Sequence, residues 1–117
     1  MSAFVLKPMD RFEWERIIRR AGLPSQVKYL GLMAATYGNK DGTSVRPGVE
    51  LLARVMSVSE PTVKRNLAAL RTAGFIERTK QGNRHAKKSD EYRLTVPSDV
   101  LERLVLDPDE KPLSADQ

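Results

Sequence analysis

The chain has 117 residues, of which 40% are hydrophobic, and this length fits one compact domain with a modest core. It has no cysteine and one histidine, which excludes disulfides and thiolate zinc sites and disfavours a histidine-based metal site or catalytic triad. Basic and acidic groups number nine and five in residues 1–59, nine and four in 60–97, and two and six in 98–117. Positive charge is therefore densest in the third quarter of the chain, where we expect a polyanion contact.

The sequence also disfavours membrane and enzymatic roles. Its first ten residues hold an apolar run too short for a signal peptide, and no segment approaches the ~20 apolar residues that cross a bilayer. The carboxylates of Glu13, Glu15 and Glu50 have no evident acid/base partner, and there is no Walker-type phosphate loop. We therefore expect a cytoplasmic, nucleoid-associated protein with no enzymatic activity, no cofactor, no metal, no membrane partner and no small-molecule substrate.

Two scaffold helices are predicted in the first half of the chain. Asp10 can cap a helix that runs to about Arg20, and apolar residues recur along it at helical spacing, namely Trp14, Ile17, Ile18 and Ala21. Burial is the favoured role of Trp14, rather than a place on a partner surface. Ser25 is expected to cap a second helix, whose apolar face holds Val27, Leu30, Ala34 and Tyr37. Residues 43–45 are β-branched or polar and are predicted as a lone strand.

A pair of helices and a hairpin follow. The pattern predicts a short helix over residues 49–55, a break at 56–59, and a helix over 60–73 that ends at Gly74. Residues 75–79 and 92–96 are predicted strands, joined by the polar turn 80–90. Tyr92, Leu94 and Val96 alternate with Arg93 and Thr95, so that one face of the second strand can pack on the helices.

The second helix of the pair is amphipathic in a way that suits a groove-binding element. Ser59 is a good N-cap residue, and Pro61 follows it in the first turn. At about 100° per residue, Val63, Leu67 and Leu70 form a buried stripe. Arg65 and Thr72 lie opposite that stripe, and Thr62 and Lys64 flank the outer face. Leu51, Leu52, Ala53 and Val58 are expected to supply the buried contacts of the preceding helix and turn.

A resemblance to a known family runs through residues 52–76, which read LARVMSVSEPTVKRNLAALRTAGFI. This segment resembles the winged helix-turn-helix pattern of bacterial regulators of the GntR and MarR kind. With DGTSVRP at 41–47 and DEYRL at 90–94, the chain looks closer to helix-turn-helix proteins of actinobacterial phages and plasmids, including replication-initiator modules. The resemblance covers residues 25–97 and implies a mainly α-helical α+β fold with a small β-hairpin wing.

Two positions depart from the family pattern. Ser57 stands where the family turn usually has glycine, so a left-handed backbone there would carry strain. Gly48 stands where the family usually has a serine cap, and glycine still tolerates the cap geometry.

By resemblance, double-stranded DNA is the expected partner, with the helix 60–73 in the major groove and the wing 80–90 on the backbone or in the minor groove. The wing turn 80–88 holds five basic or potentially basic side chains and no carboxylate. Arg84 is the best candidate for minor-groove insertion, and His85 is expected to be a polar wing residue rather than a ligand. The residues expected to contact DNA are Arg46, Ser59, Thr62, Lys64, Arg65, Arg71, Lys80, Asn83, Arg84, His85, Lys87 and Lys88.

Glu60 is the exception on this face, because a carboxylate close to a groove repels phosphate. It either balances the dipole of the helix that it begins, which we favour, or accepts a hydrogen bond from a cytosine amino group.

Three functions stay open at this stage. The first is a transcriptional regulator, such as a repressor, of a bacterium or mobile element. The second is the DNA-binding module of a phage or plasmid replication or partition protein. The third belongs to another class, a winged-helix protein-interaction module whose basic wing docks an acidic partner. We predict the first.

Residues 1–97 are predicted to form the DNA-binding domain, and residues 98–117 a short helix capped by Ser98 and an acidic, disordered tail from residue 107. Leu101, Leu104 and Val105 form an apolar stripe on that helix. The stripe either mediates a homodimer, as in regulators that read palindromes, or packs back on the helix that carries Trp14.

Overall fold

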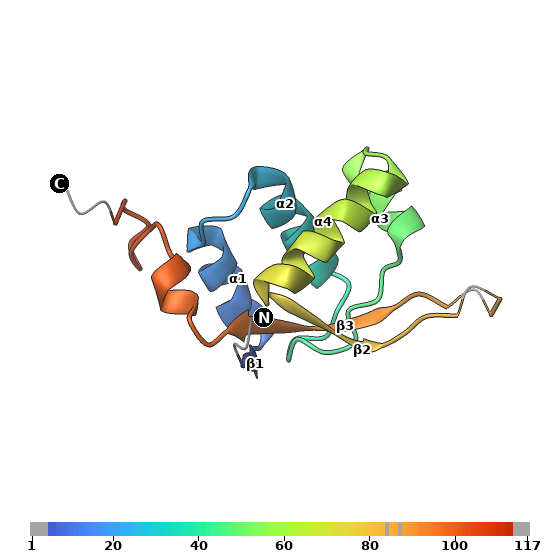
Figure 1. Ribbon diagram of the computed structural model, residues 1–117, viewed down its shortest axis with the longest axis horizontal. Coiled ribbons are helices and arrows are strands. Elements are labelled where there is room, and N and C mark those ends of the chain that lie inside the picture. The colour runs from blue at the N-terminus through green and yellow to red at the C-terminus, as the bar shows by residue number, and fades with distance from the viewer. Residues whose placement is uncertain (1–4, 84, 87, 114–117) are drawn as a thin grey trace.

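The computed structural model describes residues 5–83, 85–86 and 88–113, which form an α+β domain with four α-helices and a three-stranded antiparallel sheet (Figure 1). The helices are α1 (Arg11–Arg20), α2 (Ser25–Ala35), α3 (Val49–Met56) and α4 (Glu60–Ala73). The strands are β1 (Leu6–Pro8), β2 (Ile76–Lys80) and β3 (Glu91–Pro97), and a short 3-10 helix, η1 (Val100–Arg103), follows. This order of helices, helix pair and hairpin is compatible with a winged helix.

The first helix begins where the sequence predicts, and the second differs in its cap and its end. The Asp10 side chain caps α1 by accepting a hydrogen bond from the Glu13 amide at 2.9 Å. Ser25 does not cap α2, because it is already the first helical residue and the carbonyl of Pro24 accepts the first helical amides. Tyr37 is not part of the apolar face of α2. It lies past the end of the helix, in the turn that follows, and is 41% exposed.

Trp14 is the centre of the core and joins α1 to the sheet. Its side chain is fully buried, which confirms the predicted burial, and its indole N–H donates to the carbonyls of Phe75 and Thr95, each at 2.9 Å. The Thr95 hydroxyl in turn donates to the carbonyl of Gly74 at 2.8 Å. The expectation that Thr95 faces away from the core is therefore wrong: its side chain is buried at the point where α4 passes into β2.

The sheet has the order β1-β3-β2, and one strand of it was not predicted. The hairpin strands β2 and β3 are confirmed, with bounds within a residue or two of those expected. Strand β1 pairs antiparallel with β3, with Leu6 opposite Pro97. The expected strand at residues 43–45 is reduced to a single bridge between Val45 and Tyr92, because Ser44 has a φ of +58° and breaks the extended backbone.

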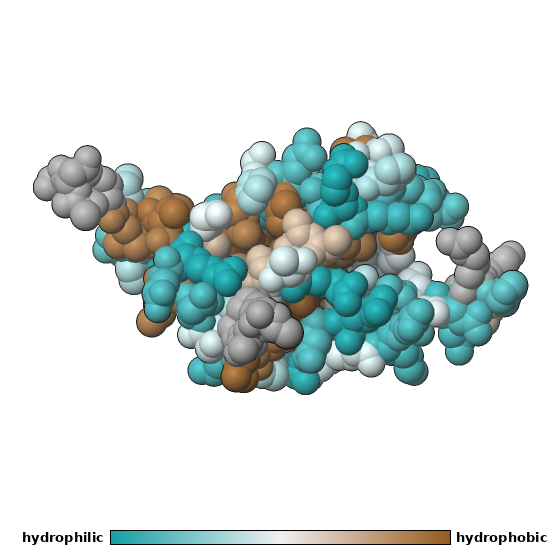
Figure 2. Space-filling model, in the orientation of Figure 1, coloured by the Kyte–Doolittle hydropathy of each residue, from teal (hydrophilic) through white to brown (hydrophobic). Residues whose placement is uncertain are grey.

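The C-terminal segment folds back on the end of α1. Ser98 does not cap the short helix η1, because Asp99 is the residue that directly precedes the helix. The Ser98 amide donates to the carbonyl of Val5. Leu104 and Val105 lie past the end of η1, so the expected apolar stripe does not lie on one helix. Leu104 bridges to Ala21, as the packing-back alternative expects, but Leu101 is 80% exposed and Val105 is 49% exposed. Apolar surface over this end of the molecule is visible at the left of Figure 2.

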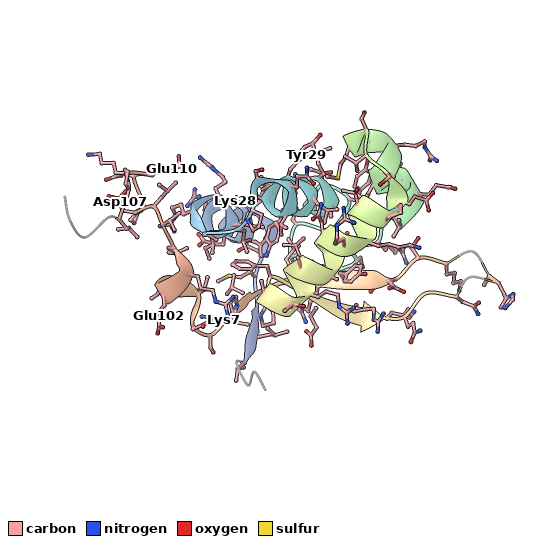
Figure 3. All side chains as sticks on the ribbon, turned by 45° about the horizontal axis from the view of Figure 1, so that its top comes forward. Lys7, Lys28, Tyr29, Glu102, Asp107 and Glu110 are labelled. Carbon is pink, nitrogen blue, oxygen red and sulfur yellow. The ribbon has the colours of Figure 1, made fainter. Side chains whose placement is uncertain are left out.

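Residues 107–113, expected as part of a disordered tail, instead form an ordered turn. The Asp107 carboxylate accepts hydrogen bonds from the amides of Asp109 and Lys111, both at 2.9 Å, and Glu110 forms an ion pair with Arg19 at 2.7 Å. Figure 3 shows Asp107 and Glu110 at the opposite end of the molecule from the hairpin. The rest of the expected tail, 114–117, lies outside the described residues.

The role of Trp14 predicts a large stability effect. Replacing Trp14 by Phe keeps an aromatic ring but removes the N–H that serves two buried carbonyls, so we expect the free energy of unfolding to fall by about 2 kcal/mol. Urea denaturation followed by circular dichroism measures the change. Phe12→Leu is the control, since Phe12 is 56% exposed, and it should unfold at nearly the wild-type midpoint. Equal midpoints for all three proteins would contradict this role.

Candidate functional site

Helices α3 and α4 are joined by a short turn in which Ser57 adopts a left-handed conformation, with φ +59° and ψ +44°. From the sequence we expect strain in a left-handed backbone here, because a residue other than glycine adopts that conformation at a cost in free energy. Gly48, which precedes α3, has φ +84°, and a Cβ there would meet the Ser89 hydroxyl at 2.6 Å. Glycine at 48 therefore allows the hairpin segment to approach the start of α3 closely.

Helix α4 has the two faces that its sequence predicts. Val63 and Leu70 are fully buried and Leu67 is 8% exposed, whereas Lys64, Arg65, Arg71 and Thr72 are exposed. Ser59 caps the helix, because its hydroxyl accepts from the Thr62 amide at 3.3 Å. The Thr62 side chain is half-buried, and its hydroxyl oxygen accepts from the Ser59 hydroxyl at 2.9 Å and from the Arg65 guanidinium at 3.3 Å. These contacts hold Arg65 along the first turns of the helix.

The hairpin that joins β2 to β3 carries the other expected residues. Lys80, Asn83, His85 and Lys88 are all exposed. The backbones of Asn83 and Lys88 exchange two hydrogen bonds of 2.9 Å, and the Asn83 side chain accepts from the amides of His85 and Ala86. Asn83 thus shapes the tip of the hairpin, which extends away from the body (Figure 1). Arg84 and Lys87 lie outside the described residues.

Asp90 fixes the base of this hairpin, a role that sequence reasoning missed. Its carboxylate accepts from the Gly82 amide at 2.6 Å and from the Arg78 guanidinium and the Tyr92 hydroxyl, each at 3.4 Å. Partial burial by itself would raise the pKa of Asp90, but these hydrogen bonds and the charge of Arg78 lower it overall. A Cβ at Gly82 would lie 2.3 Å from the Lys88 carbonyl oxygen, so only glycine fits beside this contact.

The Tyr92 hydroxyl belongs to the same cluster and donates to Asp90. Burial and the adjacent carboxylate of Asp90 raise the pKa of Tyr92. An aspartate eight residues from a glycine across a predicted turn was the only signal in the sequence for this cluster.

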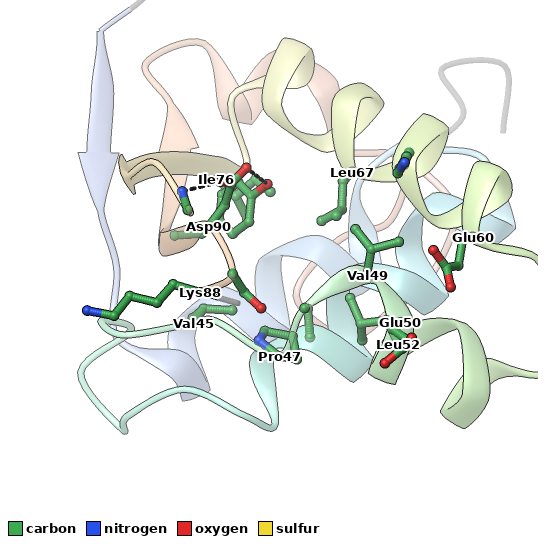
Figure 4. Close-up of a pocket in the computed structure, with 16 residues that line it drawn as sticks. Val45, Pro47, Val49, Glu50, Leu52, Glu60, Leu67, Ile76, Lys88 and Asp90 are labelled. Carbon is green, nitrogen blue, oxygen red and sulfur yellow. Dashed lines mark hydrogen bonds between the residues drawn. The ribbon is translucent and has the colours of Figure 1, made fainter. Parts of the chain in front are cut away.

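A cleft of about 530 Å³ lies between the hairpin and the helices (Figure 4). Its floor is apolar and includes Val45, Leu52, Leu67 and Ile76. Its rim is polar and includes Lys64 of α4 on one side and Lys88 of the hairpin on the other.

Two of the residues expected to contact DNA do not line this cleft and instead lie beside other side chains of the protein. Arg71 lines a separate groove with Arg78 of β2. Arg46 forms an ion pair with Glu91 at 3.7 Å.

Three carboxylates also line the cleft, and two of them have structural partners. Asp90 is held by the Gly82 amide and Arg78, and Glu50 forms an ion pair with Arg54 at 3.6 Å. Glu60 is exposed, and within the part of the chain that the structure describes no cation lies within ion-pair distance of it. Among the described residues, the rim therefore offers two lysine cations and one carboxylate without an ion pair.

Among residues 5–83, 85–86 and 88–113, no group of three or more His, Cys, Asp or Glu side chains could hold a metal ion. Within the same described residues, every helix is too short or too polar to traverse a bilayer.

Comparison with protein-family models, with curated proteins and with solved structures finds no match to this chain. We therefore infer the function from the residues and the geometry of the site itself.

The contacts of Asp90 predict that the stability of the hairpin depends on pH. Because the pKa of Asp90 is lowered in the folded state, this carboxylate contributes fully to stability at pH values above the ordinary pKa of aspartate. The contribution is lost as the pH falls through the lower pKa of the folded state. We expect amide hydrogen exchange at Gly82 and Lys88, corrected for intrinsic rates, to accelerate in acid before exchange in α4 does. Asp90→Ala should show this acceleration already at neutral pH.

The matched control is Glu77→Gln, which removes an exposed carboxylate from β2 and leaves the Gly82 contact in place. Wild-type protection at Gly82 in the Asp90→Ala variant would show that another contact holds the hairpin.

Proposed function

We propose that this protein is a winged helix-turn-helix domain that binds double-stranded DNA with sequence preference and regulates transcription. Helix α4 is the proposed recognition helix, and the β2–β3 hairpin is the proposed wing. The observation that supports this function most directly is that Lys64 and Lys88 line one cleft, although they come from α4 and from the hairpin.

The groove dimensions of DNA support a role for this cleft in binding one phosphate strand. A major groove about 12 Å wide admits an α-helix, and one sugar-phosphate strand separates it from the adjacent minor groove. With α4 in the major groove and the hairpin on the minor groove, that strand would cross the cleft between Lys64 and Lys88. Both side chains are exposed and their ammonium groups can bind phosphate oxygens.

Sequence preference is assigned to the outer face of α4. Arg65 is exposed in the first half of the helix, and a guanidinium can donate two hydrogen bonds to O6 and N7 of guanine. The Thr62 hydroxyl accepts a hydrogen bond from Arg65, which restricts the side chain before any DNA is bound. Ser59 and Thr62 add hydroxyl groups near the helix N-terminus, where phosphate is attracted.

Selection of bound duplexes from a random pool at ~150 mM salt tests the function. A transcriptional regulator should enrich one short motif, and two spaced copies of the motif would indicate a dimer. A replication or partition module would also enrich a motif, and the position of that motif at promoters or at an origin separates these roles. Failure to retain any duplex would instead favour the protein-interaction function.

Substitutions in the two elements should have different effects. We expect Arg65→Ala to reduce the preference for the selected motif over random DNA about tenfold, because it removes a base contact. Lys88→Ala should weaken binding to both duplexes alike and reduce the slope of log affinity against log salt by about one, because it removes a phosphate contact.

Fluorescence anisotropy at several salt concentrations measures both effects. Lys111→Ala is the control, since Lys111 is an exposed lysine in the C-terminal segment, away from α4 and the hairpin. If Arg65→Ala and Lys88→Ala bind specific and random duplexes as the wild type does, the assignment of helix and wing is wrong.

A further inference from the structure

We infer that Glu60 determines specificity by accepting a hydrogen bond from the amino group of a cytosine in the major groove. This inference rests on the proposed function and goes beyond it, because it names the base that one position of the site requires. At this position a carboxylate, rather than a cation, would recognise the base.

The other carboxylates of the cleft each have an ion-pair or hydrogen-bond partner within the protein. Asp90 receives the Gly82 amide, the Arg78 guanidinium and the Tyr92 hydroxyl, and Glu50 pairs with Arg54. Glu60 has no such ion pair among the described residues, although Lys64 stands one turn further along the same helix. Figure 4 shows Lys88 on the far side of the cleft, with its ammonium group pointing away from Glu60.

The position of Glu60 suits a base contact. Glu60 is the first residue of α4, and its carboxylate lies at the cleft beside the N-terminal end of that helix. The first turns of a recognition helix are the part that reaches base edges.

A favourable interaction with the helix dipole requires only proximity to the N-terminus, and Ser59 already caps that end. The dipole interaction that the sequence favours and a base contact are compatible, because the same carboxylate can make both.

The chemistry of the groove selects cytosine. A carboxylate only accepts hydrogen bonds, and the major groove offers amino donors on cytosine N4 and adenine N6. At adenine the acceptor N7 lies beside the amino group and repels a carboxylate, whereas cytosine presents the amino group alone. A carboxylate in a DNA interface also repels phosphate, so Glu60 reduces binding to every duplex that lacks the cytosine and thereby increases discrimination.

Exchange of the side chain at this position provides a specific test. In the motif selected by the wild type, we expect one position to require cytosine by about tenfold over the other bases. Glu60→Gln should shift that one position toward adenine, because a side-chain amide can donate to N7 and accept from N6. Glu60→Ala should lose the preference at that position and bind random DNA more tightly than the wild type.

The control variant is Glu50→Gln, which removes a carboxylate from the same cleft but one paired with Arg54, and it should keep the wild-type motif. If Glu60→Gln and Glu60→Ala keep the wild-type preference and differ only in thermal midpoint, Glu60 acts on the helix dipole alone and the inference is overturned. If the wild type itself enriches no motif, the proposed function fails, which is a separate result.

Discussion

The structure depends on one buried junction, where the chain leaves α4 and enters β2. Gly74 ends the helix with φ +86°, and the next residue, Phe75, offers its carbonyl to both the Trp14 indole and the Thr95 amide. The Thr95 hydroxyl donates to the Gly74 carbonyl, so that α1, α4, β2 and β3 meet around two side chains that are fully buried. Unpaired polar groups are costly in such a place, and this cost fixes the sheet against the helix.

The junction sets the direction of the hairpin, and Asp90 sets its shape further out. The Asp90 carboxylate ties Gly82 on one side of the turn to Arg78 and Tyr92 on the strands. Lys88 and Lys64 therefore lie at one cleft, although neither lysine takes part in the buried junction or in the Asp90 cluster. In the proposed function, this arrangement matches two grooves and the phosphate strand between them, and the unpaired Glu60 adds discrimination rather than affinity.

Sequence reasoning predicted the elements that have strong local signals. The stripe of Val63, Leu67 and Leu70, the cap at Ser59 and the stop at Gly74 all follow from helical periodicity and end preferences. Features that depend on distant partners were missed. Strand β1 has three residues and includes Pro8, so it shows no alternation, and it exists because β3 offers a free edge. The Asp90 cluster and the ordered turn around Asp107 likewise depend on contacts that no short pattern encodes.

In the proposed function, α4 and the hairpin contact the same DNA from one side of the molecule. Backbone amide chemical shifts, measured as the protein is titrated with a selected duplex, would map this contact residue by residue. We expect the shifts to concentrate at residues 60–73 of α4 and 80–90 of the hairpin and to leave the C-terminal segment around Asp107 unchanged. Shifts confined to the C-terminal segment, or to only one of the two elements, would rule out this mode of binding.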